Sequence, residues 1–139
     1  MADSAEEAAG GKDLVIYATP LDVALEMMRD HAAGWGDATV TDVAGLKEPL
    51  ASVAGELGFA EQFVGSHPMA GGTATGYEAS SADLFAGETV FVCGGAAESE
   101  RIEAVESMWQ AMGARVRSID ADAHDRLMVW ASHLPQLVS

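Results

Sequence analysis

The sequence predicts an α/β fold in which helices cover a mainly parallel β-sheet. Short apolar runs of strand length alternate with longer stretches whose apolar residues recur at helical spacing. Several of these runs are continuously apolar, which is typical of strands buried on both faces of a parallel sheet. The chain of 139 residues is long enough for about one such domain.

The first half of the chain contains two strand and helix pairs. The apolar run 14–18 predicts a buried strand that ends at Thr19 and Pro20, and a second strand is expected over 38–43. Apolar residues three or four positions apart indicate a helix after each strand. These residues are Leu21, Ala24, Leu25 and Met28 in one helix, and Leu46, Leu50, Val53 and Leu57 in the other. Residues 1–12 are polar and without periodicity, and they predict a loose N-terminal segment.

Three further strands are expected in the second half, over 62–66, 89–93 and 115–119. A third helix lies between the last two strands and is marked by Ile102, Val105, Trp109 and Met112. A final helix follows, with Asp122 as its expected N-cap. This alternation of strands and helices is the pattern of βαβ units.

The charge and composition exclude several classes of protein. The chain has 22 acidic residues against 7 basic ones, a net charge of -15, so its field repels nucleic acid. No apolar run approaches the length of a membrane span, and the start lacks the pattern of a leader peptide. We therefore expect a cytoplasmic protein without nucleic-acid or membrane partners. Cys93 is the only cysteine, so we expect a buried thiol and no metal site.

The residues that follow the first three strands are candidates for a ligand site, because open α/β sheets bind ligands at the carboxyl ends of their strands. These residues are Thr19 and Pro20, the segment 42–47, and the segment 67–72. All are small, polar or rich in glycine, which allows a ligand to approach the backbone. Each also has a purely structural interpretation: Pro20 starts a helix, Asp42 caps one, and the glycines make turns.

Four segments carry a resemblance to a known family when they are taken in order. They are 41–47 (TDVAGLK), 65–71 (GSHPMAG), 124–125 (HD) and 132–135 (SHLP). Together they resemble the prephenate and arogenate dehydrogenases of tyrosine biosynthesis, from about Asp13 to the last residue. The resemblance implies the second half of a Rossmann-type NAD(P)-binding domain over 13–121 and the first helix of a helical dimerisation domain over 122–139. It also implies NAD or NADP as cofactor, prephenate or arogenate as substrate, and a homodimer.

The resemblance assigns roles to individual residues. His67 would accept a hydrogen bond from the hydroxyl of the substrate ring, while hydride leaves the same carbon for the nicotinamide and carbon dioxide is lost. Ser132 and His133 would face the substrate and the nicotinamide. Gly45 and Gln136 stand close to the same site, where many members have a serine and a second histidine. Contacts with the cofactor are expected from Thr19, Pro20, Asp42, Val43 and Lys47.

The same resemblance predicts a chain that is truncated at both ends. No strand followed by G-x-G-x-x-G is present, and residues 13–20 match a later strand of the family. The first βαβ half, with its diphosphate site, is therefore expected to be missing. The arginine that binds the substrate carboxylate in the family would lie beyond Ser139. We accordingly expect the isolated chain to be inactive.

The remaining histidines have structural interpretations. His124 and Asp125 are expected to fix the start of the last helix, with Asp125 near its positive end. His124 and His133 are nine residues apart, on opposite faces of a helix, so they cannot share a metal ion. His31 has no expected partner.

Two other functions stay open at this stage. One is a divergent Rossmann reductase for another hydroxy acid, because such enzymes also place apolar strands and glycine loops around a nicotinamide. The other is a protein without catalytic activity, either a partner subunit or the product of a decayed gene, which the missing glycine loop would suit.

Overall fold

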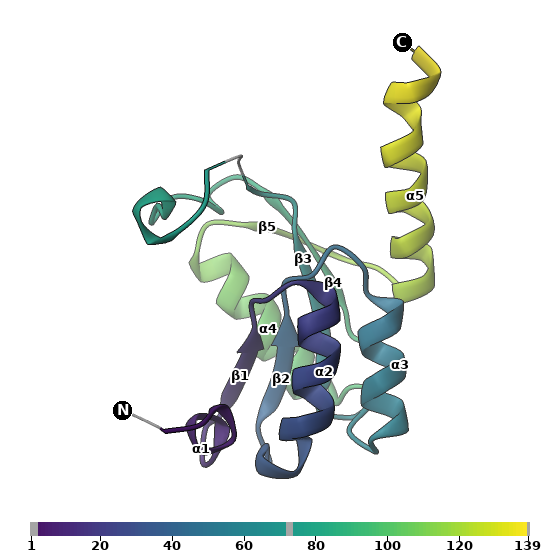
Figure 1. Ribbon diagram of the computed structural model, residues 1–139. Helices are drawn as coiled ribbons and strands as arrows, with labels where there is room; N and C mark the ends of the chain where they lie inside the picture. Colours follow the sequence, from purple (N-terminus) through teal and green to yellow (C-terminus); the bar gives the residue numbers. More distant parts are fainter. Residues whose placement is uncertain (1–2, 72–73, 139) are drawn as a thin grey trace.

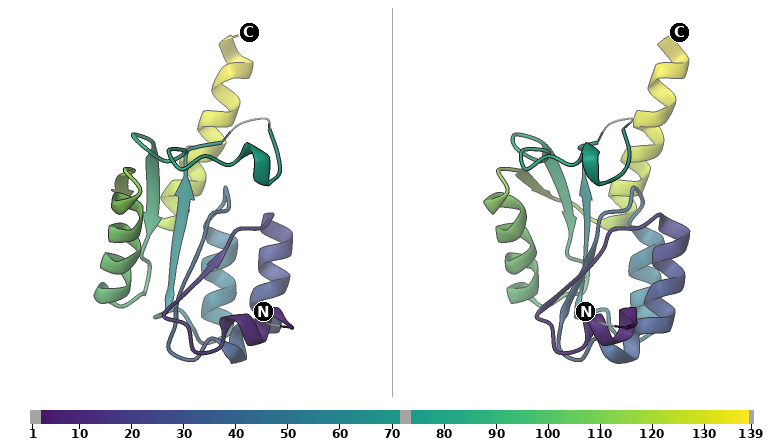
Figure 2. Two further views of the ribbon diagram at one scale, coloured as in Figure 1. Left: turned by 90° about the vertical axis from the view of Figure 1, so that its left-hand side faces the viewer. Right: turned by 60° about the vertical axis from the view of Figure 1, so that its left-hand side comes forward.

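The computed structural model contains a five-stranded sheet between two layers of helices (Figures 1 and 2). It describes residues 3–71 and 74–138, without the side chains of Glu6 and residues 133–138. The strands lie across the sheet in sequence order: β1 (Leu14–Tyr17), β2 (Thr39–Asp42), β3 (Phe63–Pro68), β4 (Thr89–Cys93) and β5 (Arg115–Ser118). The predicted α/β class is confirmed.

Two helices cover one face of the sheet and one covers the other. α2 (Leu21–His31) and α3 (Glu48–Glu56) share a face, and α4 (Ser99–Ala111) lies on the opposite side, as Figure 2 shows. The 3₁₀ turns η1 (Ala32–Gly34) and η2 (Tyr77–Ala79) lie in connections. A short helix, α1 (Ala5–Ala9), differs from the expected loose segment, because its alanines favour a helix and Ala9 is buried.

The sheet is mainly parallel, as predicted, with one antiparallel pair. β1, β2 and β3 are parallel neighbours, and β4 and β5 form a further parallel pair, while β3 and β4 run in opposite directions. A parallel pair needs a crossover, usually an α-helix. In the link between β3 and β4, residues 69–71 and 74–88 contain only η2, so β4 returns antiparallel.

The core consists of two clusters, one on each face of the sheet. Between the sheet and α2 and α3 lie Tyr17, Ala24, Met28, Trp35, Val40, Leu50, Val53 and Phe63. Between the sheet and α4 lie Val64, Val90, Val92, Val105 and Trp109. Neighbouring residues such as Phe63 and Val64 enter opposite clusters because successive side chains of a strand point to opposite faces. This explains why apolar residues stand next to each other in strands such as β1 and β4.

Several predicted boundaries change. β3 continues to Pro68, so His67 lies within a strand and not in the loop after it. The N-terminus of α5 (Ala121–Val138) is capped by Asp120, not by Asp122, because the Asp120 carboxylate accepts the backbone N–H groups of Asp122 and Ala123. Leu46 precedes α3 and is 38% exposed, so it does not belong to the buried stripe of that helix.

The fold brings the carboxyl ends of β2 and β3 next to the first turn of α5. α5 begins beside the N-terminus of α3 and then extends away from the sheet (Figure 1). No helix in the described ranges is both long and apolar enough to cross a membrane.

Candidate active site

His67 is the centre of the candidate site. It lies near the carboxyl end of β3, opposite Phe91 of β4, and its side chain is partly buried. A Cβ atom built on Gly45, in the loop between β2 and α3, would lie 3.9 Å from His67 Nε2. Nε2 therefore faces that loop at Gly45, a residue without a side chain.

The other ring nitrogen of His67 contacts a second histidine. His67 Nδ1 lies 2.9 Å from Nε2 of His124, and His124 Nδ1 lies 2.7 Å from the carboxylate of Asp125. The His124 side chain is fully buried, edge-on to the rings of both His67 and Phe91. The sequence patterns did not predict this chain of contacts, although His124 and Asp125 stand together in the first turn of a helix after the last strand.

Asp125 caps the start of α3, whereas the sequence predicted a role at the start of its own helix, α5. Its two carboxylate oxygens accept the backbone N–H groups of Lys47, at 2.8 Å, and Glu48, at 2.9 Å. Burial alone would raise the pKa of Asp125, but the hydrogen bonds from His124, Glu48 and Lys47 outweigh burial and lower this pKa. Asp125 is thus an ionised cap on α3, contributed by α5.

Asp42 and Lys47 form a buried ion pair beneath His67. Both side chains are fully buried, and the Asp42 carboxylate also accepts the backbone N–H groups of Ala44, at 2.8 Å, and Ser66, at 3.2 Å. Lys47 Nζ donates to the carbonyl oxygen of Ser66 at 2.6 Å. Burial raises the pKa of Asp42 and lowers that of Lys47, while each partner's charge acts in the opposite direction.

This buried pair changes the role expected for Asp42 and Lys47. Their charged groups bind each other and the backbone of β3, so they hold the loop 43–47 against the residue before His67. Gly65 makes room for this arrangement, because a Cβ there would lie 3.1 Å from Lys47 Cδ. Direct contact with a cofactor through either side chain would need the pair to open.

Burial keeps His67 itself neutral at neutral pH. Burial, and then the neighbouring basic groups of His124 and Lys47, lower the pKa of His67 from 6.5 to about 4. The buried Cys93 lies on the neighbouring strand, and burial raises its pKa to about 12, so it is an inert thiol as predicted. Among the side chains that the structure describes, no three of His, Cys, Asp or Glu gather as a metal site requires.

Thr19, Pro20 and Val43 lie at the carboxyl ends of β1 and β2. The Thr19 hydroxyl is buried, and no group in the described part of the chain bonds to it. Pro20 immediately precedes α2, and the Val43 N–H donates to the carbonyl oxygen of Tyr17 at 3.2 Å. An unpartnered buried hydroxyl is costly unless a ligand or water completes it, so Thr19 fits a ligand-binding role.

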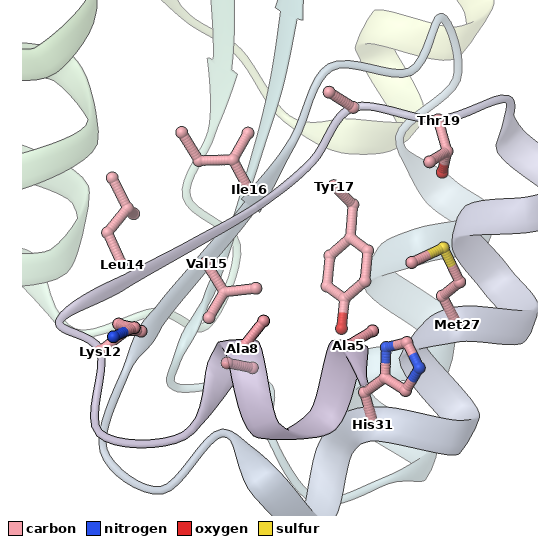
Figure 3. Close-up of a pocket in the computed structure, with 12 residues that line it drawn as sticks. Ala5, Ala8, Lys12, Leu14, Val15, Ile16, Tyr17, Thr19, Met27 and His31 are labelled. Atoms are coloured by element: carbon pink, nitrogen blue, oxygen red, sulfur yellow. The ribbon is translucent and has the colours of Figure 1, made fainter. Parts of the chain in front are cut away.

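A cavity of about 290 Å³, whose lining does not include His67, runs along β1 (Figure 3). Its walls come from α1, β1 and α2, with Thr19 near one end. His31, which had no expected partner, stacks on Tyr17 there with ring centroids 6.5 Å apart. The structure does not bring His31 to the candidate site.

The predicted residues of α5 are not brought to His67 by any described contact. Ser132 is exposed, and its hydroxyl donates to the carbonyl oxygen of Val129 in the same helix at 2.9 Å. The side chains of His133 and Gln136 lie outside the described residues. α5 continues through Pro135 to Val138 as one helix.

Comparisons with known proteins place the chain in a family. The family model of the prephenate dehydrogenase nucleotide-binding domain matches residues 1–118 of this chain. The prephenate dehydrogenase of Lactococcus lactis is 26% identical over 131 residues, which cover 91% of this chain and 35% of that protein. The chain thus spans about a third of that relative's length.

Solved structures agree with this match. The prephenate dehydrogenase of Aquifex aeolicus has a TM-score of 0.83 and 29% identity, over 96% of this chain and 48% of the other. A structure of that enzyme with hydroxyphenyl propionate and NAD+ has a TM-score of 0.74 and 27% identity, covering 96% and 46%. The Synechocystis arogenate dehydrogenase has a TM-score of 0.81 and 26% identity, covering 90% and 45%.

Proposed function

This chain belongs to the family of prephenate dehydrogenase nucleotide-binding domains, and from that premise we propose that it supplies the nicotinamide side and the proton acceptor of a prephenate or arogenate dehydrogenase. The observation that carries the proposal is the position of His67. Its Nε2 faces Gly45 at the carboxyl ends of β2 and β3, where sheets of this kind bind their ligands.

The chemistry of His67 suits the proposed reaction. A neutral imidazole can accept a hydrogen bond from the hydroxyl of the substrate ring and take its proton as the carbonyl forms. The lowered pKa keeps His67 neutral at pH 7. Loss of hydride from the same carbon and of the ring carboxylate as carbon dioxide would leave an aromatic ring.

The proposed cofactor is NAD or NADP, which would accept the hydride. Thr19 and Pro20 would hold its nicotinamide end, with Val43 from the next loop, and the unpartnered Thr19 hydroxyl supports this placement. Residues 1–139 contain no strand followed by G-x-G-x-x-G, so we assign no diphosphate contact. Asp42 and Lys47 would act indirectly, by holding the loop that carries Val43 and Gly45.

The remaining parts of the proposal concern the surroundings of the site. We propose that Ser132, His133 and Gln136 face the substrate from α5, and that residues 122–139 begin a helical domain that pairs two copies of the protein. The backbone of α5, which begins beside His67 and extends past it, supports this arrangement. The cytoplasm is the proposed location.

A chimera tests the proposed function. Residues 1–139 would replace the matching part of the Aquifex aeolicus enzyme, which amounts to 48% of that chain. We expect reduction of NAD or NADP, followed by absorbance, only when prephenate or arogenate is supplied. The unmodified relative is the positive control, and this chain alone is expected to give no turnover. A folded chimera that binds the cofactor but turns over neither substrate would contradict the proposal.

A further inference from the structure

We propose that His124 is a positioning residue, which fixes His67 in the tautomer that carries its proton on Nδ1 and leaves Nε2 as a hydrogen-bond acceptor. Asp125 completes the chain by orienting His124. The inference rests on the proposed function in one respect only, the role of His67 Nε2 as the proton acceptor of the reaction. The tautomer itself is argued from the contacts of three side chains, with His124 neutral.

The assignment of donors begins at Asp125. Its carboxylate can only accept, and it already accepts two backbone N–H groups, from Lys47 and Glu48. The His124 nitrogen that lies 2.7 Å from it, Nδ1, must therefore donate. In the arrangement that we propose, His124 is a neutral imidazole, which has one donor and one acceptor, so its Nε2 accepts.

The assignment of His124 determines that of His67. Because His124 Nε2 accepts, the nitrogen 2.9 Å from it, His67 Nδ1, must donate. His67 Nε2, which faces Gly45, then keeps its lone pair. Without such a partner, either nitrogen of a neutral imidazole can carry the proton.

The surroundings leave His124 little freedom to change these roles. Its side chain is fully buried, and its ring packs edge-on against Phe91, with centroids 5.4 Å apart. Asp125 is held by the start of α3, so the chain of contacts joins α5, α3 and β3. When Nε2 takes a proton, the positive charge on His67 can be stabilised through Nδ1–H and His124 toward the ionised Asp125.

Nuclear magnetic resonance reads the tautomer directly in this chain, without substrate or cofactor. Long-range ¹H–¹⁵N correlation spectra at neutral pH should show His67 with a protonated Nδ1 and an unprotonated Nε2. A His67→Gln variant identifies the signals. A scalar coupling between His67 Nδ1 and His124 Nε2 should report the hydrogen bond. Wild-type His67 with its proton on Nε2 would overturn the proposal, whether or not any variant folds.

Two substitutions of His124 separate positioning from packing. Gln can place an acceptor near the former Nε2, so His124→Gln should keep the Nδ1–H tautomer of His67. Leu fills space but cannot accept, so His124→Leu should shift His67 toward the Nε2–H tautomer. Far-ultraviolet circular dichroism checks that both variants fold. An unchanged tautomer in folded His124→Leu, or a shifted one in folded His124→Gln, would contradict the proposal.

This test can fail separately from the proposed function. An inactive chimera with the expected tautomer would contradict the proposed reaction but not the positioning role of His124. An active chimera whose His67 carries its proton on Nε2 would contradict the positioning role but not the proposed reaction.

Discussion

At the scale of single residues, the site depends on charged and polar groups that the fold buries together. Asp42, Lys47 and His124 are all fully buried, and each has a partner for its charge or its ring nitrogens. Such groups are costly to bury alone. Breaking one pair should therefore affect stability more than removing an ion pair at the surface.

The pair of Asp42 and Lys47 gives the first prediction. Lys47→Met keeps most of the aliphatic volume but leaves the Asp42 carboxylate buried without its counter-ion. We expect the free energy of unfolding in urea to fall by about 3–5 kcal/mol. The control is Arg126→Met, which removes the exposed pair with Asp122 and should cost less than about 1 kcal/mol. Equal losses in the two variants would show that the buried pair does not hold the loop.

The second prediction concerns pH and His67. Its pKa is lowered from 6.5 to about 4, so the unfolded chain takes up this proton at a higher pH than the native chain. The stabilisation from neutral His67 is complete above pH 6.5 and is lost as pH falls toward 4, by roughly 2–3 kcal/mol. Urea unfolding across this range should show a smaller decline in His67→Gln than in the wild type. Parallel curves would contradict the lowered pKa.

At the scale of elements, α5 exposes large apolar side chains. Leu127, Val129 and Trp130 are 44%, 52% and 66% exposed, on a helix that extends away from the sheet (Figure 1). Exposed apolar patches of this kind are sites of association. The position of α5 beyond the sheet explains the exposure, because neither core cluster reaches it.

The third prediction is therefore self-association through α5. Sedimentation should show larger species at high sodium chloride than at low, because salt screens the repulsion from a net charge of -15 over about 10 Å or less. Trp130→Glu should reduce the association. Tyr77→Ser removes another exposed aromatic side chain, 91% exposed, on η2, and should leave association unchanged. A wild-type monomer at both salt concentrations would contradict the prediction.

At the scale of the whole molecule, local patterns predicted most of the fold, and long-range contacts account for what they missed. The five strands were recognisable because apolar runs such as 89–93 are bounded by polar or glycine-rich segments. The reversed direction of β4 depends on the link before it, whose path no periodicity describes. The helix α1 was not predicted, because it depends on the burial of Ala9 against the rest of the fold.

In the candidate site, too, local patterns predicted some features, and others depend on long-range contacts. His67 was recognisable from its place after an apolar run and from the family motif. Its contact with His124 joins residues 57 positions apart, so no local pattern reports it. The burial of Lys47 was equally hidden, because lysine is almost always exposed unless it is paired.

The role of His67 in the proposed dehydrogenase is the central claim, and steady-state kinetics of the chimera test it most directly. His67→Asn should lower kcat by about 10²–10⁴-fold, the usual contribution of a general base, with little change in KM. His31→Asn changes a histidine in the cavity along β1 and should leave kcat unchanged. A folded His67→Asn chimera with the kcat of its parent would contradict the account.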